Sequence, residues 1–240
     1  MNKKYIYRVL AVCAMIFASG TTMQAQFEQS FFLNGALPTA QFNDAVNIDG
    51  LSAPEPYCPL TKTQVGKGAS VGLGAGYRMG YKFDVGFGYV TPYVNVDIFW
   101  NQLKSEYRDA FTMAACDKPN YFNIPVYMGI NYRYDLTTIF TVFGEFGLGP
   151  DFLMITGEGW GKDNNPVLAQ MGFYKNLRYS SSAHFAWQVG VGSYFGKHVS
   201  LGIHYYGLGK HVIEYSNIEN SLPVELRNLG MLALRIGFHL

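Results

Sequence analysis

The sequence has little charge and few cysteines, and it contains no long apolar run beyond its first residues. Charged residues make up 15% of the 240 positions, and only three residues are Cys. After residue 25 no stretch approaches the roughly 20 consecutive apolar residues that a transmembrane helix needs. Lys and Arg together number 18 against 17 Asp and Glu, so no strong positive field attracts nucleic acid. These absences exclude a membrane protein that crosses by later helices and a nucleic-acid-binding protein.

The N-terminus is typical of an export signal. Lys3, Lys4 and Arg8 give a positive start, and residues 9–18 form an apolar run too short to span a bilayer. Ala25 supplies a small residue at a plausible cleavage point before Gln26. We therefore predict a signal peptide over 1–25 and a mature domain over 26–240; the alternative is a buried N-terminal helix. The mature chain would carry 15 basic and 17 acidic residues.

Aromatic residues and glycine are abundant. Aromatics reach 16%, and 27 residues are Gly. Low charge with many aromatics suits a small membrane barrel, because lipid-facing surfaces exclude charge and membrane interfaces favour aromatic rings. An exported β-sandwich would also fit this composition.

Apolar and polar residues alternate with period 2, which is typical of β-strands. The alternation is clearest at the C-terminus and recurs over 68–81, 122–134 and 184–195. At the C-terminus one face holds Leu232, Leu234, Ile236, Phe238 and Leu240, and the other holds Ala233, Arg235, Gly237 and His239. The predicted strands are 27–37, 68–81, 85–99, 121–134, 139–153, 183–195, 199–208 and 228–240. We expect a β-bulge in the third strand, because Pro92 removes a ladder donor and the apolar parity changes nearby.

The predicted connections alternate between short and long. Tight links fall near 82–84, 135–138 and 196–198, and long links near 42–67, 100–120, 154–182 and 209–227. An outer-membrane barrel sorts its connections in this way, with short periplasmic turns and longer outside loops. The fold class predicted is therefore all-β, an eight-stranded antiparallel outer-membrane β-barrel.

Several short motifs carry a family resemblance over essentially the whole mature chain. They are residues 36–42 (ALPTAQF), 123–126 (NIPV), 144–149 (GEFGLG), 187–192 (WQVGVG) and 205–209 (YYGLG). In order and spacing they resemble the porin-like outer-membrane β-barrel family, which is frequent in Bacteroidetes. The resemblance implies a small barrel like OmpX or OmpA, and it implies no shared enzymatic activity.

The interior of an eight-stranded barrel is narrow enough for side chains to fill. Inward glycines make room for larger inward residues, among them His204 and Gln188. Glu145 and Arg133 lie on neighbouring strands, and a buried carboxylate needs a cationic partner. We predict an inward network of Glu145 with Arg133, and with Arg78 or Arg235. The functional alternative is a gated path for protons or small ions.

Cys58 and Cys116 fall in the first two long links. In an oxidising compartment, two cysteines on adjacent loops of one side suggest a disulfide. Free thiols or a metal site are the alternatives, although no His-Cys spacing supports a metal.

Catalytic residues are not evident. Ser181, Ser182 and His184 lie near the expected outer rim, and His211 opens the last predicted link. Adjacency along the chain is no evidence for a triad, whose members meet in space. The segments 101–120 and 157–182 instead offer aromatic and charged loop residues, which would bind a partner, a glycan or lipopolysaccharide, or form an interface belt.

The sequence thus favours a non-enzymatic, monomeric barrel of the bacterial outer membrane that uses no cofactor. We expect it to contribute to envelope integrity or to bind surfaces through its long loops. Its expected partners are outer-membrane lipid, lipopolysaccharide and an extracellular ligand or protein. The alternatives are a narrow diffusion channel, a lipid-modifying enzyme and a soluble periplasmic binding module.

Overall fold

The computed structural model describes residues 26–45, 67–107, 120–156, 178–179, 182–216 and 221–240. The predicted signal peptide, Cys58 and Cys116 lie outside these residues. Within the described part, no helix has the length and apolar character needed to cross a membrane.

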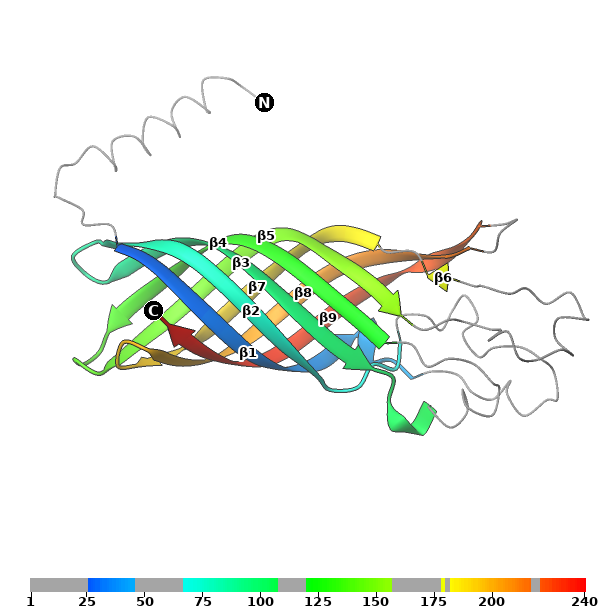
Figure 1. Cartoon of the computed structure of the whole chain (residues 1–240), viewed down its shortest axis with the longest axis horizontal. Coiled ribbons are helices and arrows are strands. Elements are labelled where there is room, and N and C mark those ends of the chain that lie inside the picture. The colour runs from blue at the N-terminus through cyan, green and yellow to red at the C-terminus, as the bar shows by residue number, and fades with distance from the viewer. Residues whose placement is uncertain (1–25, 46–66, 108–119, 157–177, 180–181, 217–220) are drawn as a thin grey trace, which may run out of the picture.

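Eight long strands and one short strand make up almost all of the described chain (Figure 1). The long strands are β1 (Gln26–Ala40), β2 (Gly72–Asp84), β3 (Tyr89–Gln102), β4 (Asn120–Asp135), β5 (Phe140–Thr156), β7 (Ser182–Phe195), β8 (Val199–Ser216) and β9 (Ser221–His239). The short strand β6 (Arg178–Tyr179) pairs with β8, and a single turn of 3-10 helix, η1 (Gln41–Asn43), follows β1.

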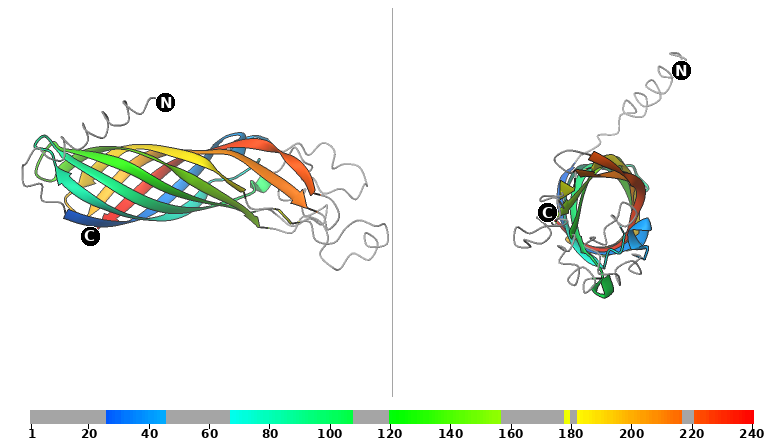
Figure 2. Two further views of the ribbon diagram at one scale, coloured as in Figure 1. Left: turned by 90° about the horizontal axis from the view of Figure 1, so that it is seen from above. Right: turned by 90° about the vertical axis from the view of Figure 1, so that its right-hand side faces the viewer.

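The eight long strands close into a barrel. Each pairs antiparallel with its neighbour along the chain, and β9 pairs both with β8 and with β1. Arg235 shows the closure, because it lies opposite Gly202 of β8 on one side and Asn34 of β1 on the other. The view along the axis shows the resulting ring (Figure 2). The predicted eight-stranded antiparallel barrel is confirmed.

The two ends of the barrel differ. At one end, here called the turn end, lie the start of β1, the C-terminus and three tight connections at 85–88, 136–139 and 196–198 (Figure 1). At the opposite end, the loop end, β1, β3 and β5 finish, and β2, β4 and β7 begin.

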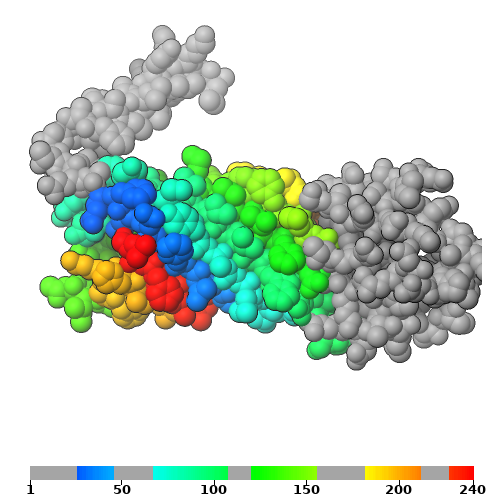
Figure 3. Space-filling model, in the orientation of Figure 1, coloured from blue at the N-terminus to red at the C-terminus, as the bar shows by residue number. Residues whose placement is uncertain are grey.

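Strand alternation sends apolar side chains outward and polar ones inward. On β9, Leu234 is 53% exposed whereas Arg235 is 2% exposed. The wall seen in Figure 3 is covered by side chains of β1, β2 and β9 without a break. Exposed aromatic side chains lie toward both ends of the strands: Trp100, Phe152, Phe185 and Trp187 toward the loop end, and Phe27, Tyr81, Tyr134, Phe195 and Phe238 toward the turn end. An apolar band between two aromatic girdles is the outer surface of a membrane barrel.

The expected bulge in the third strand is absent. β3 keeps one register with β2 from Leu73↔Trp100 to Asp84↔Tyr89, and only the pairs at Pro92 and Thr91 drop out of the ladder. Pro92 therefore interrupts the pairing without adding a residue, because it lacks the N–H but keeps the strand extended. The change of parity arises in the turn before Tyr89, where Gly86 and Gly88 take positive φ.

The last long link was also predicted wrongly. Most of 209–227 is strand, since β8 runs to Ser216 and β9 starts at Ser221. Register shifts lie between Gly207 and Gly209 and between Val212 and Glu214. Each shift breaks the simple alternation, which is why this hairpin resembled a loop in sequence.

Candidate functional site

The middle of the barrel interior is occupied by two ion pairs that reach across the lumen. The first joins Arg78 of β2 to Glu145 of β5. Both guanidinium Nη atoms donate to the two carboxylate oxygens at 2.7 Å. Both side chains are almost wholly buried. A bidentate arginine–carboxylate pair is short and directional, so it fixes both side chains in the lumen.

The second pair joins Asp97 of β3 to Arg235 of β9. Arg235 Nη2 lies 2.6 Å from Asp97 Oδ2, and its Nε donates to Asn34 Oδ1 at 3.0 Å. Tyr206 of β8 also donates to Asp97 Oδ2, at 3.2 Å. We call Arg78, Asp97, Glu145 and Arg235 the central charge layer.

Further contacts connect the two pairs and fill the space around them. Glu145 accepts from Asn131 Nδ2 at 2.9 Å, and His204 Nδ1 lies 3.2 Å from its Oε1. Arg235 Nη1 lies 3.6 Å from the same oxygen. The guanidinium of Arg78 stacks 3.9 Å from the ring centroid of Tyr93. The layer is thus one connected cluster with contributions from strands on all sides of the barrel.

Inward glycines create the room for this layer. A Cβ on Gly76 would collide with the carboxylate of Asp97, and one on Gly190 would collide with the ring of His204. Outward glycines differ, because a Cβ on Gly35 or Gly144 would meet nothing within 4 Å. Close packing of this kind leaves the middle of the lumen filled by side chains.

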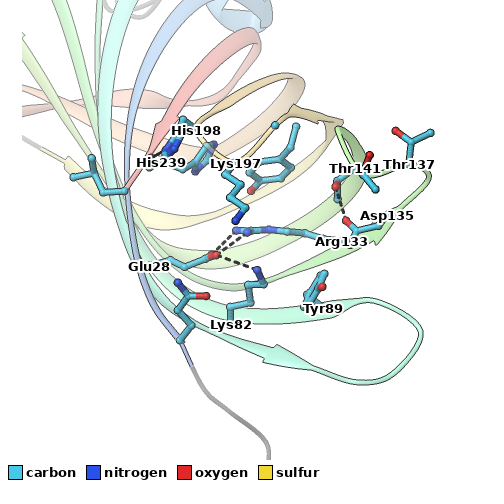
Figure 4. A pocket seen from close by; sticks show the side chains of 15 residues that line it. Glu28, Lys82, Tyr89, Arg133, Asp135, Thr137, Thr141, Lys197, His198 and His239 are labelled. Atoms are coloured by element: carbon cyan, nitrogen blue, oxygen red, sulfur yellow. Dashed lines mark hydrogen bonds and ion pairs between the residues drawn. The ribbon is translucent and has the colours of Figure 1, made fainter.

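A second charged group lies at the turn end, around a cavity of about 330 Å³ that we call the mouth pocket (Figure 4). Glu28 of β1 is its central acceptor. Arg133 of β4 approaches Glu28 at 2.8 and 3.0 Å, and Lys82 of β2 lies at 3.9 Å. Lys82 and Glu28 keep 26% and 17% of their side-chain surface exposed, so water screens this group more than the central charge layer.

The turns complete the mouth pocket. Lys197 stands in the β7–β8 turn beside Gly196, whose φ of 65° belongs to the left-handed region. Thr137 and Thr138 come from the β4–β5 turn. Asp135 Oδ1 accepts a hydrogen bond from the hydroxyl of Thr141.

The predicted interior residues are all inward-facing, but they divide between these two groups. Glu145, Arg78 and Arg235 lie in the central charge layer. Arg133 does not bond to Glu145 as expected. The register places Asn131 opposite Glu145, and Arg133, two residues nearer the turn end, bonds to Glu28. Arg133 Nε donates to Asn131 Oδ1, so it reaches Glu145 only through Asn131. Asp97 and Glu28 were not singled out from the sequence. The available signal was their position on the inward faces of β3 and β1.

At the loop end, His211 and Asp151 form a third buried polar contact. His211 Nε2 lies 3.0 Å from Asp151 Oδ2 and 2.9 Å from the carbonyl oxygen of Leu208. His184 Nδ1 accepts the backbone N–H of Lys210 at 3.3 Å. Neither contact involves the hydroxyl of Ser182, and Ser181 lies outside the described residues. Among the described side chains, no three His, Cys, Asp or Glu residues are placed to hold a metal ion.

Comparison with known proteins finds small outer-membrane barrels among solved structures. OprG of Pseudomonas aeruginosa shares 12% identity at a TM-score of 0.46, covering 90% of this chain and 95% of that protein. Neisserial surface protein A shares 12% identity at a TM-score of 0.43, covering 90% and 97%. The outer membrane enzyme PagL shares 14% identity at a TM-score of 0.35, covering 89% and 98%. No family model and no curated protein matches the sequence.

The architecture is evident from the chain itself. Its strand order is closed, its outer wall is apolar between two sets of aromatic side chains, and its polar residues face inward. Only a closed barrel satisfies all backbone hydrogen bonds of a sheet inside a bilayer. This chain is a small eight-stranded β-barrel of the bacterial outer membrane, with its turn end toward the periplasm.

Proposed function

We propose that this barrel is non-enzymatic and closed to solutes, and that it supports envelope integrity or binds surfaces through its outer loops. The central charge layer carries the proposal. Its two pairs extend from opposite walls, with Arg78 bonded to Glu145 and Arg235 bonded to Asp97 at the same level of the lumen. A barrel whose middle is filled in this way offers solutes no path, so its partners meet it at the membrane or at its ends.

The outer loops are the proposed contact region for partners. A rigid barrel holds connecting segments at fixed points, and binding residues are concentrated on such segments. Long connections join β1 to β2, β3 to β4 and β5 to β7, and most of their residues lie outside the described ones. The proposed partners remain outer-membrane lipid, lipopolysaccharide and an extracellular ligand or protein.

Other features of the chain fit the same proposal. Membership of the porin-like family frequent in Bacteroidetes, the OmpX- or OmpA-like character, and cleavage of a signal peptide before Gln26 remain proposals that the sequence motifs support. A Cys58–Cys116 disulfide between the first two long loops is a further proposal. Alkylation of the mature protein followed by non-reducing electrophoresis tests it: a bridged chain changes mobility on reduction, and an unchanged mobility refutes the bridge.

Complementation of a deletion strain tests the proposed function. The wild-type barrel and a variant with each long loop replaced by a short Gly-Ser connection would be expressed at equal levels. If the wild-type barrel and the loop-replaced variant both restore detergent resistance, the barrel contributes to envelope integrity. If only the wild-type barrel restores adhesion, the outer loops bind surfaces. Faster uptake of small solutes on expression would instead favour a diffusion channel, and a mass shift of lipid A would favour a lipid-modifying enzyme. Either of these results contradicts the proposal.

A further inference from the structure

The mouth pocket contains two lysines, Lys82 and Lys197, whose ammonium donors are not fully used by its carboxylates. Its two side-chain carboxylates are already engaged, since Glu28 bonds to Arg133 and Asp135 bonds to Thr141. Within the described structure, the ammonium of Lys197 has no ion pair or hydrogen bond. The ammonium of Lys82 has only the 3.9 Å approach to Glu28 and a contact 4.2 Å from the ring centroid of Tyr89. Two lysines therefore retain donors for another group.

The two lysines face the same space. Lys82 lies two residues before the end of β2, whereas Lys197 stands in the β7–β8 turn across the mouth, and both line the cavity. Figure 4 shows Lys197 extending into the pocket from one side and Lys82 from another, with Arg133 and Glu28 between them. Thr137 and Thr138 add hydroxyl groups at the rim. Cations and hydroxyls converging on a cavity are suited to an anion.

The charge and size of the site limit the ligand. A volume of about 330 Å³ lies at the lower end of the range for small-molecule pockets. Glu28 and Asp135 border the same cavity, so they repel a doubly charged phosphate more strongly than a singly charged carboxylate. Since the turn end opens to the periplasm, the ligand must come from that side.

We propose that the mouth pocket binds a small carboxylate from the periplasm, with Lys197 and Lys82 donating to its oxygens. The carboxylate belongs either to a free amino acid or to a cell-wall peptide. Arg133 and Glu28 form the floor of the site and hold each other in place. This inference is independent of the role of the outer loops, because it concerns the opposite end of the barrel.

The test is an NMR titration of the full mature barrel in lipid nanodiscs, following backbone amides of 136–139 and 196–198. The probes are alanine, inorganic phosphate, a soluble muropeptide with free carboxylates, and the same muropeptide with those carboxylates amidated. We expect saturable shifts with the free carboxylates and none with the amidated form. The combined Lys82→Ala, Lys197→Ala variant should bind about fivefold more weakly, because exposed charge pairs contribute modestly.

A matched control is Lys210→Ala, which removes an exposed lysine at the loop end and should bind as the wild type does. Heat-modifiable gel migration confirms that each variant is folded. Binding of both free-carboxylate probes supports a general carboxylate site, and binding of the muropeptide alone identifies the cell wall as the source. Absence of saturable shifts with either probe, binding unchanged by the double lysine variant, or tighter binding of inorganic phosphate would overturn the proposal.

Discussion

The central charge layer and the mouth pocket contain the same types of residue, but they differ in access to water. In the layer, Arg78 and Glu145 form a bidentate pair with less than 5% of either side chain exposed. In the mouth pocket, Arg133 and Glu28 form a similar pair beside a cavity, with the partly exposed Lys82 as a third member. A buried charge must be paired by protein groups, whereas an exposed one can exchange partners. On the two proposals made above, the layer closes the lumen and the mouth pocket can bind a ligand.

The largest difference is expected on removing one carboxylate from each region. Glu145→Ala leaves Arg78 buried without its main partner, which costs about 3–5 kcal/mol in the free energy of unfolding. Urea titration in lipid vesicles, read by the heat-modifiable gel shift, measures this loss. Replacing both partners, as in Arg78→Met with Glu145→Leu, should recover most of it, because the unpaired charge is then absent. A double variant no more stable than Glu145→Ala would contradict a paired layer.

A smaller loss is expected where an inward glycine makes room for the layer. Gly76→Ala places a Cβ against the carboxylate of Asp97, and overpacking of this kind costs about 1–3 kcal/mol. Urea titration in lipid vesicles measures this loss in the free energy of unfolding as well. Gly144→Ala is the control, because its Cβ meets no atom within 4 Å, and it should change stability by no more than about 0.5 kcal/mol. Equal losses in the two variants would show that the interior is not closely packed.

The smallest effect is expected in the mouth pocket. Glu28→Gln removes the charge that Arg133 and Lys82 share, but water reaches this group, so the loss should stay below about 1 kcal/mol. Raising the salt concentration should narrow the difference between this variant and the wild type. A loss as large as that of Glu145→Ala would remove the distinction between the two regions.

The sequence predicted the barrel well and the pairing inside it only in part. Alternation from Leu232 to Leu240 identified β9 and its inward Arg235, because one face must meet lipid and the other the lumen. The partner of Arg133 was missed, since a stagger of two residues between strands decides whether it meets Glu145 or Glu28. Asp97 was missed although it alternates with the apolar Val96 and Ile98 on the same strand. Register and lumen-crossing contacts depend on closure of the whole barrel, which local patterns do not encode.

Single-channel recording in planar bilayers tests the closed lumen most directly. The wild-type barrel should show no discrete conductance steps. A second sample is a variant in which all four side chains of the central charge layer are truncated to alanine (Arg78→Ala, Asp97→Ala, Glu145→Ala and Arg235→Ala). If gel migration shows that this variant is folded, it should conduct ions. Stable, reproducible conductance steps from the wild-type protein would contradict the filled interior and indicate a channel.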